Sequence, residues 1–194
     1  MSRVVSTTVR VAEAPTVAEV RSLHDFRTRR HASLLEEARD LMVSGREEDA
    51  LKSVFEALRL ERDSYEALAL AGTLLSMLGD PEAAALYLRE AIRISPERAD
   101  AYYDLASSLL DLGRAAEALP WLESGTRLLG EREDDLVDFM YSARVEALVE
   151  LGRYDEAEAV LEEARRRSDD GLLLLAGAAD LLATRRGQPR LRLL

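Results

Sequence analysis

The stretch LGDPEAA at residues 78–84 decides the fold, because its pattern returns along the chain. It recurs as LGRAAEA at residues 112–118 and as LGRYDEA at residues 151–157, and a weaker copy, SGREEDA, occupies residues 44–50. The glycines at 45, 79, 113 and 152 are therefore separated by 34, 34 and 39 residues. A period of this length predicts an array of stacked units, each too small to bury its own apolar face.

Each unit predicts two helices, one on either side of its glycine. Before the glycine, one helical stripe consists of a large residue, a small residue four positions later and a large residue three positions after that. After the glycine, a second stripe consists of a small, a large and a small residue. The first helices carry these residues at Leu34, Leu68, Tyr102 and Tyr141, then Ala38, Gly72, Ala106 and Val145, then Leu41, Leu75, Leu109 and Leu148. The second helices carry Ala50, Ala84, Ala118 and Ala157, then Val54, Leu88, Leu122 and Leu161, then Ala57, Ala91, Gly125 and Ala164. The small residues let the paired helices approach closely, and the glycine allows a left-handed turn.

Composition favours the same all-α class. Hydrophobic residues make up 47% of the 194 residues, aromatic residues only 5%, and alanine and leucine dominate. Such a composition is typical of helices and not of sheets. The chain has no cysteine, which excludes disulfides and cysteine metal sites and leaves the redox compartment open.

On these residues the chain resembles the tetratricopeptide repeat family, with units at residues 31–64, 65–98, 99–132 and 138–171. The small residues, the glycines and Pro96 fit that family's pattern, whereas its usual tryptophan at the fourth position is absent. The resemblance implies a right-handed α-α superhelix of about four helix-turn-helix units. It also implies that the first helices of the units line a concave groove.

The segments outside the units have different compositions. Residues 1–15 alternate in a β-prone manner without a second strand, so we expect a flexible arm. Residues 16–30 predict an N-terminal helical extension with Thr16 as N-cap and Glu19 completing a capping box; whether it continues into the first unit is left open. Residues 172–186 predict a helix that caps the apolar end of the array, and residues 187–194 form a basic tail.

Charge narrows the choice of partner. The formal net charge is -11, but residues 1–30 carry six arginines against three acids, whereas residues 31–171 carry 16 basic and 33 acidic residues. An acidic body repels nucleic acid and anionic membranes, and it attracts basic partners at rates that fall with salt. The basic tail of one copy could also meet the acidic groove of another, which leaves homo-oligomerisation through the C-terminal helix or tail open.

Residues that could carry chemistry are scarce. His24 and His31 lie two helical turns apart, about 10 Å along a helix axis, which is too far for one metal ion. No phosphate-binding loop, nucleophile elbow or catalytic triad can be assembled. We therefore expect a non-enzyme without cofactor or metal.

The resemblance supplies candidate partner-binding residues, since specific positions of each first helix face the groove in that family. The candidates are Arg39, Met42, Glu66, Leu70, Thr73, Met77, Asp100, Tyr103, Asp104, Ser107, Asp111, Phe139, Ser142 and Glu146. The same positions also include Leu35, Ala143, Val149 and Glu150. Tyr103 and Phe139 are the expected anchors, because aromatic residues contribute much of an interface's energy. The basic clamp with which family members grip a peptide carboxylate is missing, since Glu66, Leu70, Asp100 and Asp104 occupy its positions.

The sequence thus predicts a cytoplasmic scaffold or adaptor that binds a basic or amphipathic protein segment in an acidic, apolar groove. A secretion-type or assembly chaperone that shelters apolar segments is the first alternative, and a self-assembling structural subunit is the second. RNA binding by the related pentatricopeptide architecture is disfavoured, because base-reading repeats need a basic track along the RNA backbone.

Overall fold

A computed structural model describes residues 17–130, 135–167 and 172–187. Within these ranges the chain forms nine helices and no strand. The helices are α1 (Val17–Val43), α2 (Glu47–Leu60), α3 (Tyr65–Met77), α4 (Pro81–Ile94), α5 (Ala99–Asp111), α6 (Ala115–Leu129), α7 (Asp135–Glu150), α8 (Tyr154–Arg167) and α9 (Leu172–Arg186). The expected arm (residues 1–15), the N-cap Thr16 and most of the basic tail lie outside the described residues.

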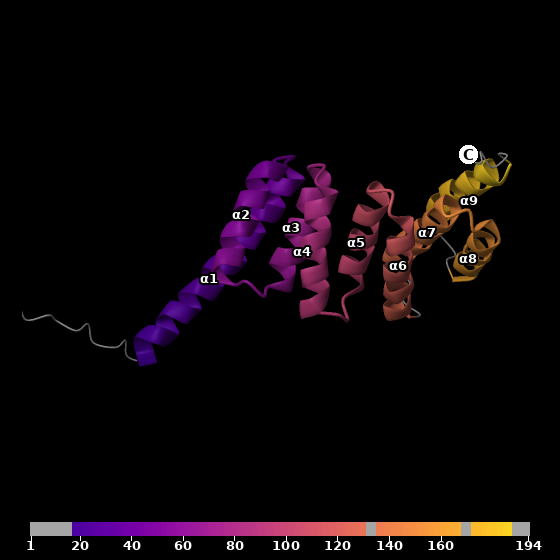
Figure 1. The fold of residues 1–194 in the computed structure, drawn as a ribbon. Coiled ribbons are helices and arrows are strands. Elements are labelled where there is room, and N and C mark those ends of the chain that lie inside the picture. The colour runs from indigo at the N-terminus through magenta and orange to yellow at the C-terminus, as the bar shows by residue number, and fades with distance from the viewer. Residues whose placement is uncertain (1–16, 131–134, 168–171, 188–194) are drawn as a thin grey trace, which may run out of the picture.

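The helices form a two-layered array that extends along one direction (Figure 1). Each odd-numbered helix packs against the even-numbered helix that follows it, and also against the next odd-numbered helix. Among the described residues, the backbones of the even-numbered helices do not approach one another closely, and contacts between these helices are made by long side chains such as Phe55 and Tyr87. Helices α1, α3, α5, α7 and α9 are therefore neighbours in one layer, here called the inner layer, and α2, α4, α6 and α8 form the outer layer. This is an all-α helical-repeat superhelix.

The core runs between the two layers and consists of the residues that the repeat pattern selects. All of these stripe residues are buried except Leu41, which is half-buried. The small positions are tightly enclosed: a methyl group added at Gly72 would lie 2.4 Å from Cγ of Leu88 on the paired helix. Small residues are thus required where two helix backbones approach each other.

The turns between paired helices use the glycines as the sequence predicts. Gly45, Gly79, Gly113 and Gly152 have φ values of 67°, 80°, 67° and 70°, a left-handed conformation that other residues rarely adopt. In the second unit Asp80 caps α4 by accepting a hydrogen bond from the backbone N–H of Ala83, and Pro81 occupies the first turn.

The other three units replace this cap with an arginine, which the sequence analysis did not anticipate. Arg46, Arg114 and Arg153 stand directly after the turn glycines, and each forms an ion pair at 2.6 Å with an acid three residues later. The acids are Asp49, Glu117 and Glu156. Hydrogen bonds from Arg114 and Arg153 hold the pKa of Glu117 and Glu156 below the ordinary range, and hydrogen bonds from Lys52 and then Arg46 do the same for Asp49. Each pair neutralises an acid on the outer layer.

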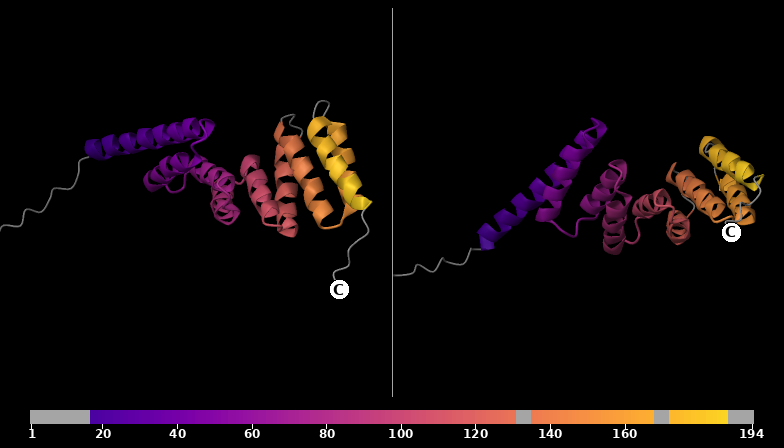
Figure 2. Two further views of the ribbon diagram at one scale, coloured as in Figure 1. Left: turned by 90° about the horizontal axis from the view of Figure 1, so that it is seen from above. Right: turned by 45° about the horizontal axis from the view of Figure 1, so that its top comes forward.

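The ends of the array show how the extra segments are used. Helix α1 is continuous from the N-terminal extension into the first unit, and Figures 1 and 2 show its first half projecting beyond the other helices. At the other end α9 packs on both α7 and α8, with Leu175, Ala178 and Leu182 buried. No helix among the described residues combines the length and apolar character needed to cross a membrane.

Candidate functional site

The fourteen candidate partner-binding residues lie on the inner-layer helices α1, α3, α5 and α7. None of them is fully buried, so all present at least part of their surface. Three further residues at the expected groove-facing positions are not accessible. Leu35, Ala143 and Val149 are buried and belong to the core. The expectation that these three face a groove is therefore wrong, because neighbouring helices cover them.

Two candidates join α3 to α5 through a hydrogen bond. The hydroxyl of Thr73 donates to the carboxylate of Asp104 at 2.8 Å. Burial raises the pKa of Asp104, and the hydrogen bond from Thr73 offsets this only in part. The carboxylate of Asp104 therefore lies where α3 and α5 meet. Among the described residues, no cation lies within ion-pair distance of it.

The two expected anchors meet between α5 and α7. The ring centroids of Tyr103 and Phe139 are 5.7 Å apart and the rings are tilted by 48°. This geometry is typical of a stabilising aromatic pair. Phe139 remains 38% exposed, so the pair offers an apolar surface on the inner layer.

Carboxylates lie near Tyr103 of this aromatic pair. Burial first, and then the charges of Glu150 and Asp111, raise the pKa of Glu146. Burial and the charges of Asp104, Glu146 and Asp111 raise the pKa of Tyr103 in the same way. The acids therefore lie close enough to one another to repel. We call this set the α5–α7 patch, made up of Tyr103, Asp104, Asp111, Phe139, Glu146 and Glu150.

The acids of the second and third units nearer to the N-terminus are already neutralised. Arg98, in the turn before α5, contacts Glu66 at 3.3 Å and Asp100 at 3.0 Å. Its guanidinium also lies 4.2 Å from the centre of the Tyr65 ring, and the Tyr65 hydroxyl donates to Asp100 at 2.7 Å. Burial acts to raise the pKa of Asp100, but the hydrogen bonds from Tyr65 and Arg98 outweigh it and lower that pKa.

Arg98 is a residue that the sequence analysis missed. No periodic signal marks it, since it lies in a turn and its partners come from two different units. Its contacts divide the candidate acids into two groups: Glu66 and Asp100 are paired within the chain, whereas the acids of the α5–α7 patch are not.

The remaining candidates flank the patch on the inner layer. Arg39 is exposed and Met42 half-buried on α1, while Leu70 is half-buried on α3. Met77, at the end of α3, is 54% exposed. Ser107 and Ser142 are half-buried on α5 and α7.

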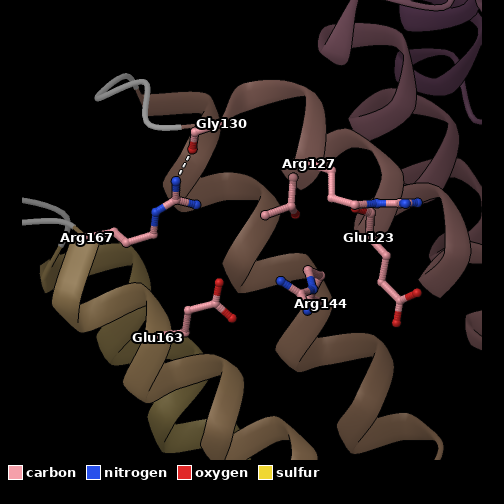
Figure 3. A pocket seen from close by; sticks show the side chains of 7 residues that line it. Glu123, Arg127, Gly130, Arg144, Glu163 and Arg167 are labelled. Carbon is pink, nitrogen blue, oxygen red and sulfur yellow. Dashed lines mark hydrogen bonds between the residues drawn. The ribbon is translucent and has the colours of Figure 1, made fainter.

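A cleft of about 410 Å³ opens between α6, α7 and α8 (Figure 3), and none of these candidates lines it. Arg144 and Glu163 point into it from α7 and α8. Tyr141 donates to Glu163 at 2.7 Å and accepts from Arg167 at 2.9 Å, and Arg167 also donates to the carbonyl of Gly130. This network ties α8 to α6 and α7, which is a structural role.

The two histidines are separated by their surroundings. On α1 His24 is exposed, whereas His31 is buried with its Nδ1 3.8 Å from Glu61. Across the parts of the chain that the structure describes, no group of three or more histidine, aspartate or glutamate side chains is placed to hold a metal ion.

Comparisons with known proteins agree with this architecture. Family models described as "Tetratricopeptide repeat" match residues 35–99, 75–133 and 141–163. Protein FlbA of Caulobacter vibrioides is 32% identical over 111 residues, which are 57% of this chain and 18% of FlbA. The chain therefore spans less than a fifth of that relative's length.

Solved structures show the same fold. A crystal structure of MamA protein superposes with a TM-score of 0.64 at 24% identity, covering 77% of this chain and 75% of MamA. YrrB, described as a tetratricopeptide repeat protein with an unusual peptide-binding site, gives a TM-score of 0.60 at 20% identity, covering 79% of this chain and 89% of YrrB. With its four glycine turns, its two layers of helices and these three matching segments, the chain belongs to the tetratricopeptide repeat family.

Proposed function

We propose that the α5–α7 patch binds a basic, amphipathic helix or extended segment of a partner protein. One observation carries the proposal: Asp104, Asp111 and Glu146 lie near Tyr103 of a partly exposed aromatic pair, and Glu150 lies near Glu146. Within the described residues no arginine or lysine lies within ion-pair distance of these four carboxylates. The arrangement lacks positive charge and offers apolar surface. A segment that combines arginine or lysine with large apolar residues supplies both.

The outer layer gives the contrast that makes this lack of positive charge informative. There Asp49, Glu117 and Glu156 each have an arginine of the same helix end at 2.6 Å. Uncompensated charge is destabilising where it is partly buried. The chain thus pairs an acid with an arginine at the start of three outer helices and leaves the acids of the patch unpaired, as expected for a surface that receives its cations from a partner.

The patch would bind through two contributions. Tyr103 and Phe139 provide rigid apolar area at low entropic cost, and the carboxylates attract the partner and fix its orientation. Membership of the tetratricopeptide repeat family supports a protein-interaction scaffold in place of an enzyme. The peptide-binding site attributed to YrrB supports a peptide ligand here by analogy.

The alternatives rest on weaker observations. A chaperone that shelters apolar segments would use the aromatic pair but would not need four carboxylates. RNA is disfavoured because the same carboxylates would repel its phosphates. A cytoplasmic location stays a prediction from the sequence.

Binding of a defined peptide tests the proposal. The probe is a fluorescein-labelled helical peptide with two apolar residues three positions apart and flanking arginines, followed by fluorescence anisotropy. We expect the double variant Tyr103→Ala, Phe139→Ala to bind it about tenfold more weakly or worse, because truncating interface anchors costs more than about 1 kcal/mol each. A peptide with glutamate in place of arginine should not bind.

The matched control is the aromatic pair of the outer layer. Phe55 and Tyr87 have the same centroid separation of 5.7 Å but lie on α2 and α4. The double variant Phe55→Ala, Tyr87→Ala, checked for equal helicity by circular dichroism, should keep full affinity. Equal losses in both double variants, or binding of the acidic peptide, would rule out the α5–α7 patch as the binding site.

A further inference from the structure

The N-terminal half of α1 is an exposed basic helix, and among the described residues its ties to α2 are made by Arg27 and Arg30, near its C-terminal end. All residues from 21 to 30, here called the α1 overhang, are exposed. They include Leu23 and Phe26, which are 65% and 63% exposed. Being three residues apart on a helix, these two side chains share a face. Within these ten residues Arg21, Arg27, Arg29 and Arg30 accompany a single acid, Asp25, and Arg30 is paired with Glu56 of α2 at 3.9 Å. The overhang is therefore basic and also carries an exposed apolar pair.

The overhang cannot fold back onto the α5–α7 patch of its own molecule. Helix α1 is continuous from Val17 to Val43, and only its later part packs in the array. Both views in Figure 2 show the first half pointing away from the other helices. Arg27 also donates to the carbonyl of Leu60 at the end of α2, which fixes the direction of the helix where it leaves the array. The overhang can therefore reach the patch of another molecule only.

The overhang has the chemistry that the proposed function requires of a ligand. Its two apolar side chains match the exposed surface of Tyr103 and Phe139. Its arginines other than Arg30, which is paired with Glu56, match the unpaired carboxylates. We propose that the α1 overhang of one copy docks on the α5–α7 patch of a second copy. The inference rests on the proposed function, because it identifies the basic segment that the patch binds.

Pairing of two overhangs with each other is the competing arrangement. It would bury Leu23 and Phe26 but bring eight arginines together, and like charges at close range repel. Docking on the patch buries the same side chains and neutralises the charge.

The contact joins two different surfaces, so it is heterologous. Each copy that donates its overhang still has a free patch, and each copy that receives one still has a free overhang. Such contacts produce open chains unless the rotation between copies closes a ring. The molecular mass should thus rise with protein concentration, and because the contact is largely electrostatic it should fall with salt.

The test is complementation between two variants of the full chain, followed by sedimentation velocity at low salt. The overhang variant is Leu23→Asp, Phe26→Asp, and the patch variant is Asp111→Lys, Glu146→Lys. Each alone should self-associate about tenfold more weakly than the native chain, as expected when an interface centre is lost. When the two variants are mixed, the intact overhang of the patch variant can dock on the intact patch of the overhang variant. The resulting one-to-one complex should grow no further, because both remaining surfaces are disrupted.

Leu86→Asp provides the control, since Leu86 is equally exposed at 66% but lies on the outer helix α4. It should associate like the native chain. A native chain that stays monomeric at low salt and high concentration overturns the inference, and so does a mixture without the one-to-one complex. If the native chain is monomeric while the arginine peptide still binds the patch, the inference fails and the proposed function stands; if neither associates, both fail.

Discussion

At the scale of single residues, the array depends on positions where nothing larger than hydrogen or methyl fits. Gly72 lies on α3 opposite Leu88, and three carbon atoms of that leucine would lie within 3.0 Å of an added methyl group. These atoms are the branched Cγ and both methyl groups of a fully buried side chain, so the leucine cannot move aside freely. The turn glycines are required for a different reason. Their positive φ angles favour glycine, whereas the space around Gly45, Gly79 and Gly113 would accommodate a methyl group.

Substitution of Gly72 by alanine should therefore destabilise the protein. We expect Gly72→Ala to lower the free energy of unfolding by about 1–3 kcal/mol, the usual cost of overpacking a core. Urea denaturation measures it. Gly177→Ala in α9 is the control, because nothing lies within 4 Å of the added methyl group, and it should be neutral or stabilise by up to about 1 kcal/mol. Equal effects at both sites would contradict the close packing of α3 on α4.

Asp104 illustrates a residue whose charge disfavours folding. Its pKa in the folded protein is raised above the ordinary 3.8, chiefly by burial. The folded state thus binds the proton more tightly than the unfolded state. The resulting penalty is absent below pH 3.8, develops as the pH rises through the folded pKa, and is complete above it.

Asp104→Asn should accordingly stabilise the protein at neutral pH while weakening the patch as a site for cations. The amide oxygen can still accept the hydrogen bond from Thr73, so the packing of α3 on α5 is kept. Chemical denaturation at pH 7 and at successively lower pH should show the gain shrinking as the pH approaches 3.8. A gain that is independent of pH would show that the carboxylate charge is not its cause.

At the scale of helices, neighbouring units are joined by a few polar contacts in addition to the core. Thr73 to Asp104 and Tyr65 to Asp100 link α3 with α5 of the next unit, whereas Tyr141 to Glu163 links the two helices of the fourth unit. Helix α9 is the last helix in the described part of the chain, and it packs on α7 and α8 at the end of the array. In an array where each unit contacts only its neighbours, destabilising a terminal helix should reduce the local stability of the adjacent helices most.

Leu182→Ala in α9 tests this locality. Leu182 is 6% exposed, and truncating a buried leucine costs about 2 kcal/mol or more. Hydrogen exchange should show faster exchange in α7, α8 and α9 while α3 and α4 are hardly changed. Leu86→Ala, at an exposed leucine of α4, should change neither region. Faster exchange throughout the array would mean that it unfolds as one cooperative unit.

At the scale of the whole molecule, the elongated array separates surfaces of opposite charge. The basic α1 overhang lies at one end, and the acidic α5–α7 patch lies several helices away on the inner layer (Figure 1). In a rigid array these surfaces cannot neutralise each other within one copy. The net charge of -11 does not reveal this separation of basic and acidic surfaces, which suits the proposed head-to-tail contact between copies. The experiment with mixed variants described above tests that contact directly.

The sequence by itself determined the repeat, the pairing of helices and nearly all of the core. These features follow from spacing along a single helix, where residues three and four apart share a face, and from glycines that the turns require. The burial of the stripe residues and the positive φ angles of the turn glycines confirm this part.

Only the tertiary structure decided which acids are free. Glu66 and Asp100 resemble Asp111 and Glu146 in the sequence, yet Arg98 neutralises the first two. It also decided that Leu35 is core and that α1 continues straight into an exposed overhang. Such outcomes depend on which side chains of different units come within a few ångströms, and a repeat period carries no information about those distances.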